Sequence, residues 1–101
     1  MPDTAMSEKA FQAVVLEAAK VNGWMVYHTY DSRRSQSGFP DLILIRGAVC
    51  LALELKSDKG IPSAAQKKWI KAFKRVKIIE ADFAYPRHLD QVVSALSARA
   101  R

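Results

Sequence analysis

The chain has 101 residues and a mass of 11.3 kDa, which allows one domain, and its 50% hydrophobic and 26% charged residues are typical of a globular protein. No apolar run reaches the roughly 18 to 20 residues that cross a bilayer, no secretory signal is recognisable, and the one cysteine, Cys50, excludes an internal disulfide. We therefore expect an intracellular protein without a membrane partner. A net charge of +6 favours a polyanionic partner, most often nucleic acid.

The glycines and prolines all fall between periodic segments, which predicts a single module over residues 1–101 with a core of about 7–97. Apolar residues at helical spacing predict a first helix over about residues 7–22, with Ser7 as its N-cap and Asn22-Gly23 as its end. Aromatic and β-branched residues predict a strand over Trp24–Tyr30, and the polar segment Asp31–Gly38 predicts a loop.

Two apolar runs, Asp41–Arg46 and Val49–Lys56, flank Gly47-Ala48, which suits a two-residue type II′ hairpin turn. Because both runs are apolar on both faces, we expect these strands in the interior of a sheet.

A second helix opens at residues 62–66, and Ala65, Trp69, Phe73 and Val76 are expected on its buried face. A short strand over Lys77–Ala81 and a final helix marked by Leu89, Val92, Val93 and Leu96 complete the order α-β-β-β-α-β-α. The predicted fold class is α/β, a mixed β-sheet flanked by helices.

The hairpin register predicts a cluster of charged side chains. If Gly47-Ala48 is the turn, Asp41 lies directly opposite Glu54, with the two Cβ atoms about 4.5–5.5 Å apart. Like charges at that spacing destabilise a sheet unless a cation neutralises them, and Mg²⁺ prefers one or two carboxylates plus water and phosphate oxygens. Lys56 leaves the same face of its strand as Glu54, where an ammonium can stabilise charge on a phosphate.

The alternative reading makes Asp41 an edge residue and pairs Glu54 with Lys56 on a solvated face. Leu53 and Leu55 argue against that reading, because a charge within an apolar strand needs a compensating partner.

Pro40-Asp41 followed, after a spacer of twelve residues, by Glu54-Leu55-Lys56 resembles the motif of the PD-(D/E)XK nuclease superfamily. Over about Ser7 to Leu96 the chain resembles one of its families, VRR-NUC, the virus-type replication and repair nucleases. The segments that carry this resemblance are Ser7-Glu8, Gly23-Trp24, Tyr27-His28, Gly38-Phe39-Pro40-Asp41-Leu42-Ile43-Leu44, Glu54-Leu55-Lys56-Ser57 and Gln66-Lys67-Lys68-Trp69. The segment Phe73–Lys77 departs from the family because it lacks the glycine that such chains often carry there.

The resemblance implies a restriction-endonuclease-like fold and a DNA endonuclease that hydrolyses phosphodiester bonds with Mg²⁺, for which Mn²⁺ can substitute. Stand-alone members are associated with branched DNA such as Holliday junctions, and such chains occur in bacteria and phages, which implies the cytoplasm of a bacterium or of a phage-infected cell. Two symmetric incisions favour a homodimer. Asp41 and Glu54 match the metal ligands, with the Leu55 carbonyl and Glu8 as additional ones, while Lys56 and Gln66 match catalytic positions.

Three of these positions keep a second interpretation. Glu8, in the first helical turn, is favoured by the helix dipole alone. Ser63-x-x-Gln66 forms a capping box, which gives Gln66 a structural role that could coexist with one in the site. For His28, a structural or substrate-contacting role is preferred to a catalytic one.

Basic residues without carboxylate partners at helical spacing predict a surface that follows a phosphate backbone. Trp24 and Trp69 are interpreted as core residues and not as platforms for bases. The predicted DNA contacts are Arg33, Arg34, Lys67, Lys68 and Lys71, with Arg46, Lys74, Arg75 and Lys77 in the same two basic groups.

Two other functions remain open. The first is a non-catalytic basic module that binds DNA and retains the fold of a nuclease. The second is a nuclease that acts on RNA, which a cleavage assay distinguishes by substrate preference.

Overall fold

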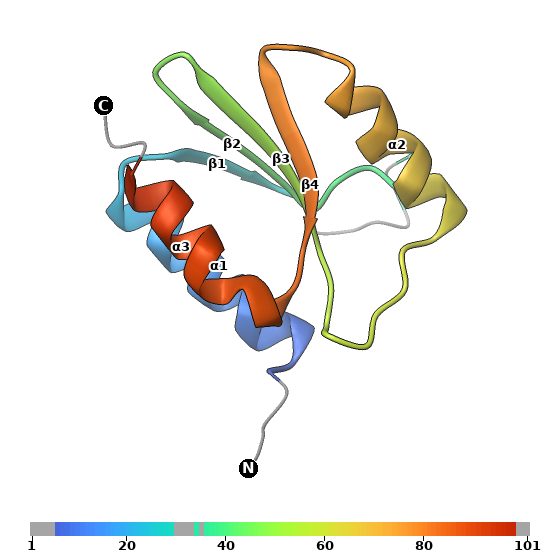
Figure 1. Ribbon diagram of the computed structural model, residues 1–101, viewed down its shortest axis with the longest axis horizontal. Helices are drawn as coiled ribbons and strands as arrows, with labels where there is room; N and C mark the ends of the chain where they lie inside the picture. The colour runs from blue at the N-terminus through green and yellow to red at the C-terminus, as the bar shows by residue number, and fades with distance from the viewer. Residues whose placement is uncertain (1–5, 30–33, 35, 99–101) are drawn as a thin grey trace.

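The computed structural model describes residues 6–29, 34 and 36–98, and it has three layers (Figure 1). Helices α1 (Glu8–Val21) and α3 (Leu89–Ala98) lie side by side on one face of the sheet, and α2 (Ala64–Lys74) lies against the other face. The strands are β1 (Met25–His28), β2 (Leu42–Arg46), β3 (Val49–Leu55) and β4 (Ile79–Ala84), and a short 3₁₀ helix, η1 (Pro86–His88), precedes α3. The predicted α/β class and the element order α-β-β-β-α-β-α are confirmed.

The sheet has the order β1-β2-β3-β4, with β2 and β3 inside it as their apolar faces predict. β2 pairs antiparallel with β1 and β3, and β3 pairs parallel with β4. Arg46 lies opposite Val49 and Leu42 opposite Leu53, so the predicted two-residue turn and its register are confirmed. Gly47 has a φ of +58° and no residue other than glycine has a positive φ among those described, which is the pattern of a type II′ turn.

Two strand boundaries differ from the prediction. β1 covers only Met25–His28 of the predicted strand, and Tyr30 lies outside the described residues. β4 begins two residues later and ends at Ala84, because its parallel pairing with Cys50–Leu55 defines its extent. Tertiary pairing, which a local pattern does not contain, therefore decides this boundary.

The buried face of α2 is also different. Ile70 is its buried residue, while Trp69 and Phe73 are half-buried and Val76 is exposed. The helix ends at Lys74 with Arg75 as its C-cap, so Val76 has left the helical stripe on which it was predicted. Among the strands, α2 packs mainly against β3 and β4, and this leaves part of its apolar side uncovered.

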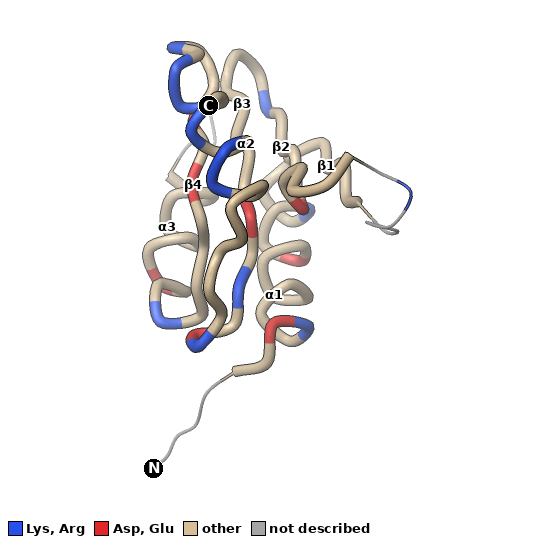
Figure 2. Tube along the Cα trace, turned by 90° about the vertical axis from the view of Figure 1, so that its right-hand side faces the viewer, with Lys and Arg blue, Asp and Glu red and all other residues tan. Residues whose placement is uncertain are grey.

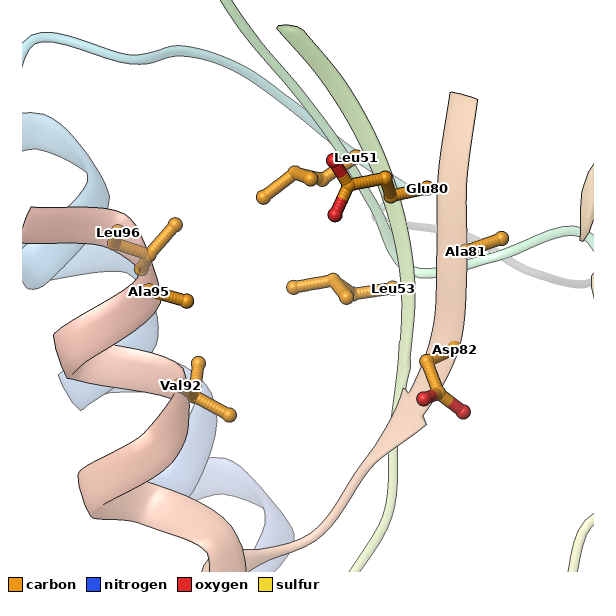
Figure 3. Close-up of a pocket in the computed structure, with 8 residues that line it drawn as sticks. All are labelled: Leu51, Leu53, Glu80, Ala81, Asp82, Val92, Ala95 and Leu96. Carbon is orange, nitrogen blue, oxygen red and sulfur yellow. The ribbon is translucent and has the colours of Figure 1, made fainter. Parts of the chain in front are cut away.

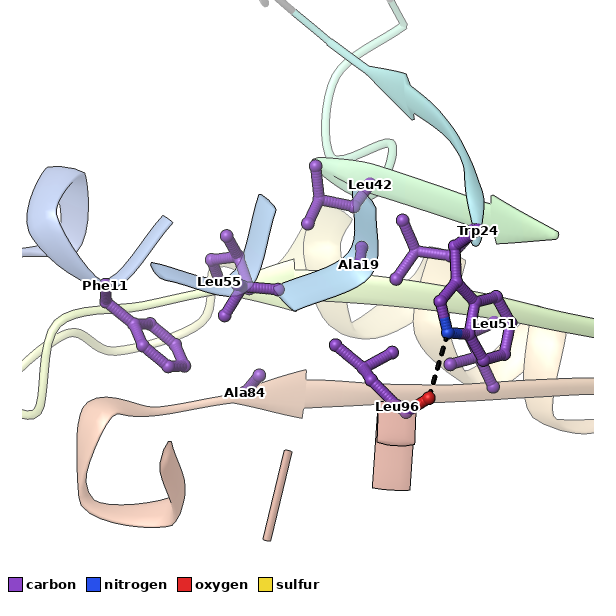
Figure 4. Packing of buried hydrophobic residues seen from close by; sticks show 10 residues of the cluster. Phe11, Ala19, Trp24, Leu42, Leu51, Leu55, Ala84 and Leu96 are labelled. Carbon is purple, nitrogen blue, oxygen red and sulfur yellow. Dashed lines mark hydrogen bonds between the residues drawn. The ribbon is translucent and has the colours of Figure 1, made fainter. Parts of the chain in front are cut away.

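The main core lies between the sheet and the pair α1 and α3 (Figure 4). Phe11, Val15 and Ala19 of α1 are fully buried there against β2 and β3, at the period of 3.6 that fits a helix face. Trp24 is 5% exposed, and its indole N–H donates to the Leu96 carbonyl at 3.1 Å, as the dashed line in Figure 4 marks.

Arg46 is half-buried and packs beside this core, so its guanidinium is not part of an open DNA-binding surface as its basic group suggested. Its Nη1 donates to the carbonyls of Asn22 (2.8 Å) and Leu96 (3.0 Å), and its guanidinium lies 4.3 Å from the ring centroid of Trp24. Both carbonyls are at helix C-terminal ends, where the backbone carries partial negative charge. Arg46 thus ties α1 and α3 to the hairpin.

Within residues 6–29, 34 and 36–98, no helix combines the length and the apolar character that a membrane crossing requires.

The segment that leads into β2 is fastened to α2. Trp69 donates its indole N–H to the Ser37 carbonyl at 3.1 Å, and the Phe39 ring meets the Trp69 ring edge-on at a centroid distance of 5.1 Å. Gly38 has a φ of +86°, and a Cβ placed on it would lie 2.4 Å from the backbone carbon of Ala65. This close approach requires glycine and positions the chain just before Asp41.

Gly38→Ala should therefore lower the free energy of unfolding by more than Gly47→Ala does. Both glycines have positive φ, which costs an alanine about 1–2 kcal/mol. Only Gly38 is crowded, and overpacking adds about 1–3 kcal/mol. Urea denaturation of the two variants measures the difference, and equal losses would contradict the tight contact with α2.

Candidate active site

The hairpin brings the two predicted carboxylates together. Asp41 directly precedes β2 and Glu54 lies on β3, so the observed register, continued by one position, sets them opposite each other. The Leu55 backbone N–H donates to Oδ2 of Asp41 at 3.0 Å, which fixes the Asp41 carboxylate at the end of the β3 segment that carries Glu54. The interpretation that places Asp41 at a sheet edge and Glu54 on a solvated face is wrong, because Glu54 is 4% exposed.

Glu54 is the one buried charged residue among those described. Gln66 donates from Nε2 to its Oε2 at 2.9 Å, and the Lys56 ammonium lies 3.8 Å from the same oxygen. Its other oxygen, Oε1, is buried and has no hydrogen-bond donor within the described part of the chain. A buried acceptor without a donor is costly, so the second oxygen is available for a group that the protein itself does not supply.

The Gln66 side chain makes two kinds of contact at once, one within the cap of α2 and one with Glu54. Its side-chain oxygen accepts the Ser63 backbone N–H at 2.8 Å, and its own backbone N–H donates to the Ser63 hydroxyl at 3.1 Å. These two bonds form the capping box at the start of α2, and the amide nitrogen that remains is the one that binds Glu54. The structural role and the contact with the site therefore coexist.

The carboxyl groups of the cluster are close enough to raise one another's pKa values. Burial raises the pKa of Glu54 to about 8, and the nearby Asp41 carboxylate, a side-chain hydrogen bond with Asp41 and, least, Glu8 add to this, against the lowering effect of Lys56. Partial burial and the Asp41 charge also raise the pKa of Glu8. Glu8 is thus within electrostatic range of the cluster from the N-terminal end of α1, and its role as a metal ligand stays a prediction.

The donor set fits a hard divalent cation. Among residues 6–29, 34 and 36–98, no group of three or more His, Cys, Asp or Glu side chains is placed to hold a metal ion by itself. Mg²⁺ does not require one, because it usually keeps several waters and takes one or two carboxylates together with substrate phosphates. Oε1 of Glu54, buried opposite a second carboxylate and without a donor in the described residues, is the oxygen that such an ion would take.

The predicted DNA contacts lie mainly on α2. Figure 2 shows basic residues gathered along α2 and the turn that follows it. Lys67, Lys68 and Lys71 are exposed and form no ion pair in the part of the chain that is described, whereas Lys74 is 3.6 Å from Asp82. Arg34 is exposed in the loop before β2, and Arg33 lies outside the described residues.

The hollow between the sheet and α3 is unsuited to phosphate (Figure 3). It measures about 200 Å³, and Leu51, Leu53 and Val92 line it together with the carboxylates of Glu80 and Asp82. Two carboxylates repel a polyanion, so DNA is not expected on this side of β4.

His28 is half-buried at the end of β1, where it lies opposite Leu42 in the strand pairing. The interpretation of His28 as a structural or substrate-contacting residue stays a prediction.

The sequence did not reveal the contact between Trp69 and the segment before β2, which sets the position of Asp41 relative to α2. The signal that could have found it is the run Gly38-Phe39-Pro40, since a glycine between polar and aromatic residues often marks a close backbone approach.

Comparison with known proteins agrees with this geometry. The model of the VRR-NUC domain matches residues 2–93 of this chain. The chain belongs to the VRR-NUC family. Among curated proteins, no sequence match is found.

Two solved structures resemble this VRR-NUC chain. One, described as "VRR_NUC domain protein", superposes with a TM-score of 0.70 at 25% identity over 92% of this chain and 87% of its own. The other, described as "VRR_NUC domain", has a TM-score of 0.68 at 19% identity over 88% of this chain and 97% of its own, and supports the fold alone.

The raised pKa of Glu54 predicts a stability that depends on pH. In EDTA, the folded state keeps the Glu54 proton to about pH 8, while the unfolded state releases it near 4.5. The contribution of Glu54 to the free energy of unfolding is therefore complete below about pH 4.5 and is lost as the pH rises to about 8. In this window, the free energy of unfolding of the wild type should fall, relative to that of Glu54→Gln, by up to about 1.4 kcal/mol per pH unit. Urea denaturation of both proteins checks this, and parallel pH profiles would contradict it.

Proposed function

We propose that this VRR-NUC chain is a metal-dependent endonuclease that hydrolyses phosphodiester bonds in DNA. The observation that carries the proposal is the buried Glu54 carboxylate, held against Asp41 with one oxygen unpartnered and with Lys56 and Gln66 on the other. A folded protein keeps such a cluster of buried acids at a cost in stability, and clusters of this kind concentrate at functional sites.

Each residue has a role that follows from its position. Asp41 and Glu54, with the Leu55 carbonyl and Glu8 as further oxygen donors, would hold Mg²⁺ or Mn²⁺. The bound ion would lower the pKa of a water molecule and stabilise charge on the phosphate. Lys56 supplies an ammonium beside the same carboxylates, where it stabilises negative charge that develops on phosphorus oxygens. Gln66 would act as a positioning residue, because its amide nitrogen holds Glu54.

In the hydrolysis, a water oxygen forms a bond to phosphorus as the bond to one ester oxygen breaks. The attacking water gives one proton to a neighbouring solvent water, and the ester oxygen takes one proton from solvent as it leaves, so that one water is consumed and the products are a phosphate monoester and a hydroxyl. Lys56, as an ammonium, can hold the attacking water or the charged phosphate oxygens in place during this exchange.

The substrate is proposed to be branched DNA, including Holliday junctions. Support comes from the family to which the chain belongs and from the exposed lysines of α2, which form a basic surface at the end of the helix that contacts Glu54. Release of counterions from phosphates would make this binding strongly dependent on salt.

Cleavage of supercoiled plasmid and four-way junctions tests the proposal directly. The wild type should cut with Mg²⁺ or Mn²⁺ and not with EDTA, and Lys56→Ala should reduce the rate by about 10²-fold or more. Lys59→Ala, which removes an exposed lysine three residues away, is the matched control and should cut normally.

If the wild type leaves every substrate intact at high enzyme concentration, the catalytic proposal is wrong, and the non-catalytic DNA-binding module replaces it. A parallel reaction with RNA of the same branched structure identifies the preferred nucleic acid.

We further propose that the protein acts as a homodimer. Met25 and Tyr27 of β1 lie opposite Ile45 and Ile43 of β2, so these four side chains share one face of the sheet. Met25 is 74%, Tyr27 57% and Ile45 44% exposed, because α2 covers only β3 and β4 on this side (Figure 1). These four side chains carry no charge, so a second chain of net charge +6 meets no like charge from them. Two copies would also supply the two active sites that symmetric incision of a junction needs.

Tyr27→Lys should therefore dissociate the dimer, because it places one charge per chain in a buried, self-complementary interface. Light scattering after size-exclusion chromatography should give twice 11.3 kDa for the wild type and 11.3 kDa for the variant. Ala10→Lys adds the same charge at an exposed position of α1 and should remain dimeric. A monomeric wild type at micromolar concentration would contradict the proposal.

A further inference from the structure

A hollow of about 440 Å³ lies between α2 and the segment that leads to Asp41. Ala65, Lys68, Trp69 and Ala72 form its helical side, at the spacing of one continuous helix stripe. Gln36 and Ser37 form its other side. The small side chains of Ala65 and Ala72 leave the space open, and the half-buried Trp69 is its one aromatic lining residue.

The hollow and the proposed active site are built from the same two segments. Gln66, which binds Glu54, is three residues before Trp69, or about 5 Å along the helix axis. On the other side, Ser37 is held by Trp69 and is followed by Gly38, whose close contact with Ala65 fixes the path to Asp41. A DNA strand with its phosphate at the carboxylates would pass directly by this hollow.

The chemistry of the lining indicates what fits there. Trp69 offers an aromatic surface, Lys68 a positive charge without an ion pair in the described structure, and Gln36 and Ser37 polar groups at the rim. A flat, apolar group with polar edges and an attached phosphate matches all three, and this is the composition of a nucleotide. A base within a duplex has both faces stacked, so only an unpaired base could enter.

We propose that this hollow is a subsite for one unpaired nucleobase beside the scissile phosphate, with Trp69 as the stacking residue and Lys68 on the adjoining phosphate. The proposal rests on the proposed nuclease function and adds to it a basis for selecting branched DNA. It also changes the interpretation of Trp69, which was expected to belong to the core, because the residue serves both the contact with Ser37 and the hollow.

The test compares binding of two DNA duplexes, each with a short single-stranded flap, in EDTA so that no hydrolysis is needed. One flap carries normal bases and the other abasic residues, which keep the phosphates and remove the stacking faces. Stacking on an aromatic side chain predicts about 5- to 150-fold tighter binding of the normal flap by the wild type.

Ala72→Leu fills the hollow from an exposed helix position without removing Trp69 or any hydrogen bond. It should reduce the preference to less than about twofold while the thermal unfolding temperature is unchanged. Ala10→Leu makes the same change on the exposed side of α1 and should keep the full preference. Lys68→Ala should weaken both flaps by the same factor, since it removes a phosphate contact.

Equal binding of the two flaps by the wild type, or an undiminished preference in Ala72→Leu, would overturn the subsite. These outcomes are separate from those of the cleavage assay. If the protein cuts junctions but binds the two flaps equally, the nuclease proposal stands and the subsite is wrong. If it distinguishes the flaps but never cuts, the base-binding subsite stands and the nuclease proposal is wrong.

Discussion

The structure depends on a carboxylate that the fold buries beside another carboxylate. Glu54 is the second-last residue of an otherwise apolar strand, with 4% of its surface exposed, and the hairpin register sets Asp41 against it. Lys56 and Gln66 compensate one of its oxygens and leave the other without a donor in the described residues. Burial of an incompletely compensated charge is expensive, so the surrounding contacts have to hold the pair in place.

Those contacts come from elements far apart in the chain. The capping box at Ser63 presents the Gln66 amide to Glu54, and Trp69, on the same helix, holds the segment just before Asp41 through Ser37. One helix therefore positions both carboxylates. Arg46 supports the turn end of the hairpin by binding the carbonyls at the ends of α1 and α3, which ties the hairpin to the helical layer that these two helices form.

Much of this arrangement could be predicted from the sequence, and the reason is local geometry. A two-residue turn at Gly47-Ala48 determines the register of the whole hairpin, and the register alone sets Asp41 against Glu54. The capping box was equally local. By contrast, the parallel pairing that extends β4 to Ala84, the burial of Arg46 against Trp24 and the partial exposure of Trp69 all depend on neighbours distant in sequence. A pattern of charges and apolar positions does not contain that information.

The central claim is that a divalent cation belongs between Asp41 and Glu54. A crystal structure of the protein soaked in Mn²⁺ tests it most directly, through the position of the anomalous density peak. The account predicts one peak in contact with both carboxylates, at metal–oxygen distances of about 2 Å. A metal bound elsewhere with this pair left empty, or the two side chains on opposite faces of the sheet, would contradict it.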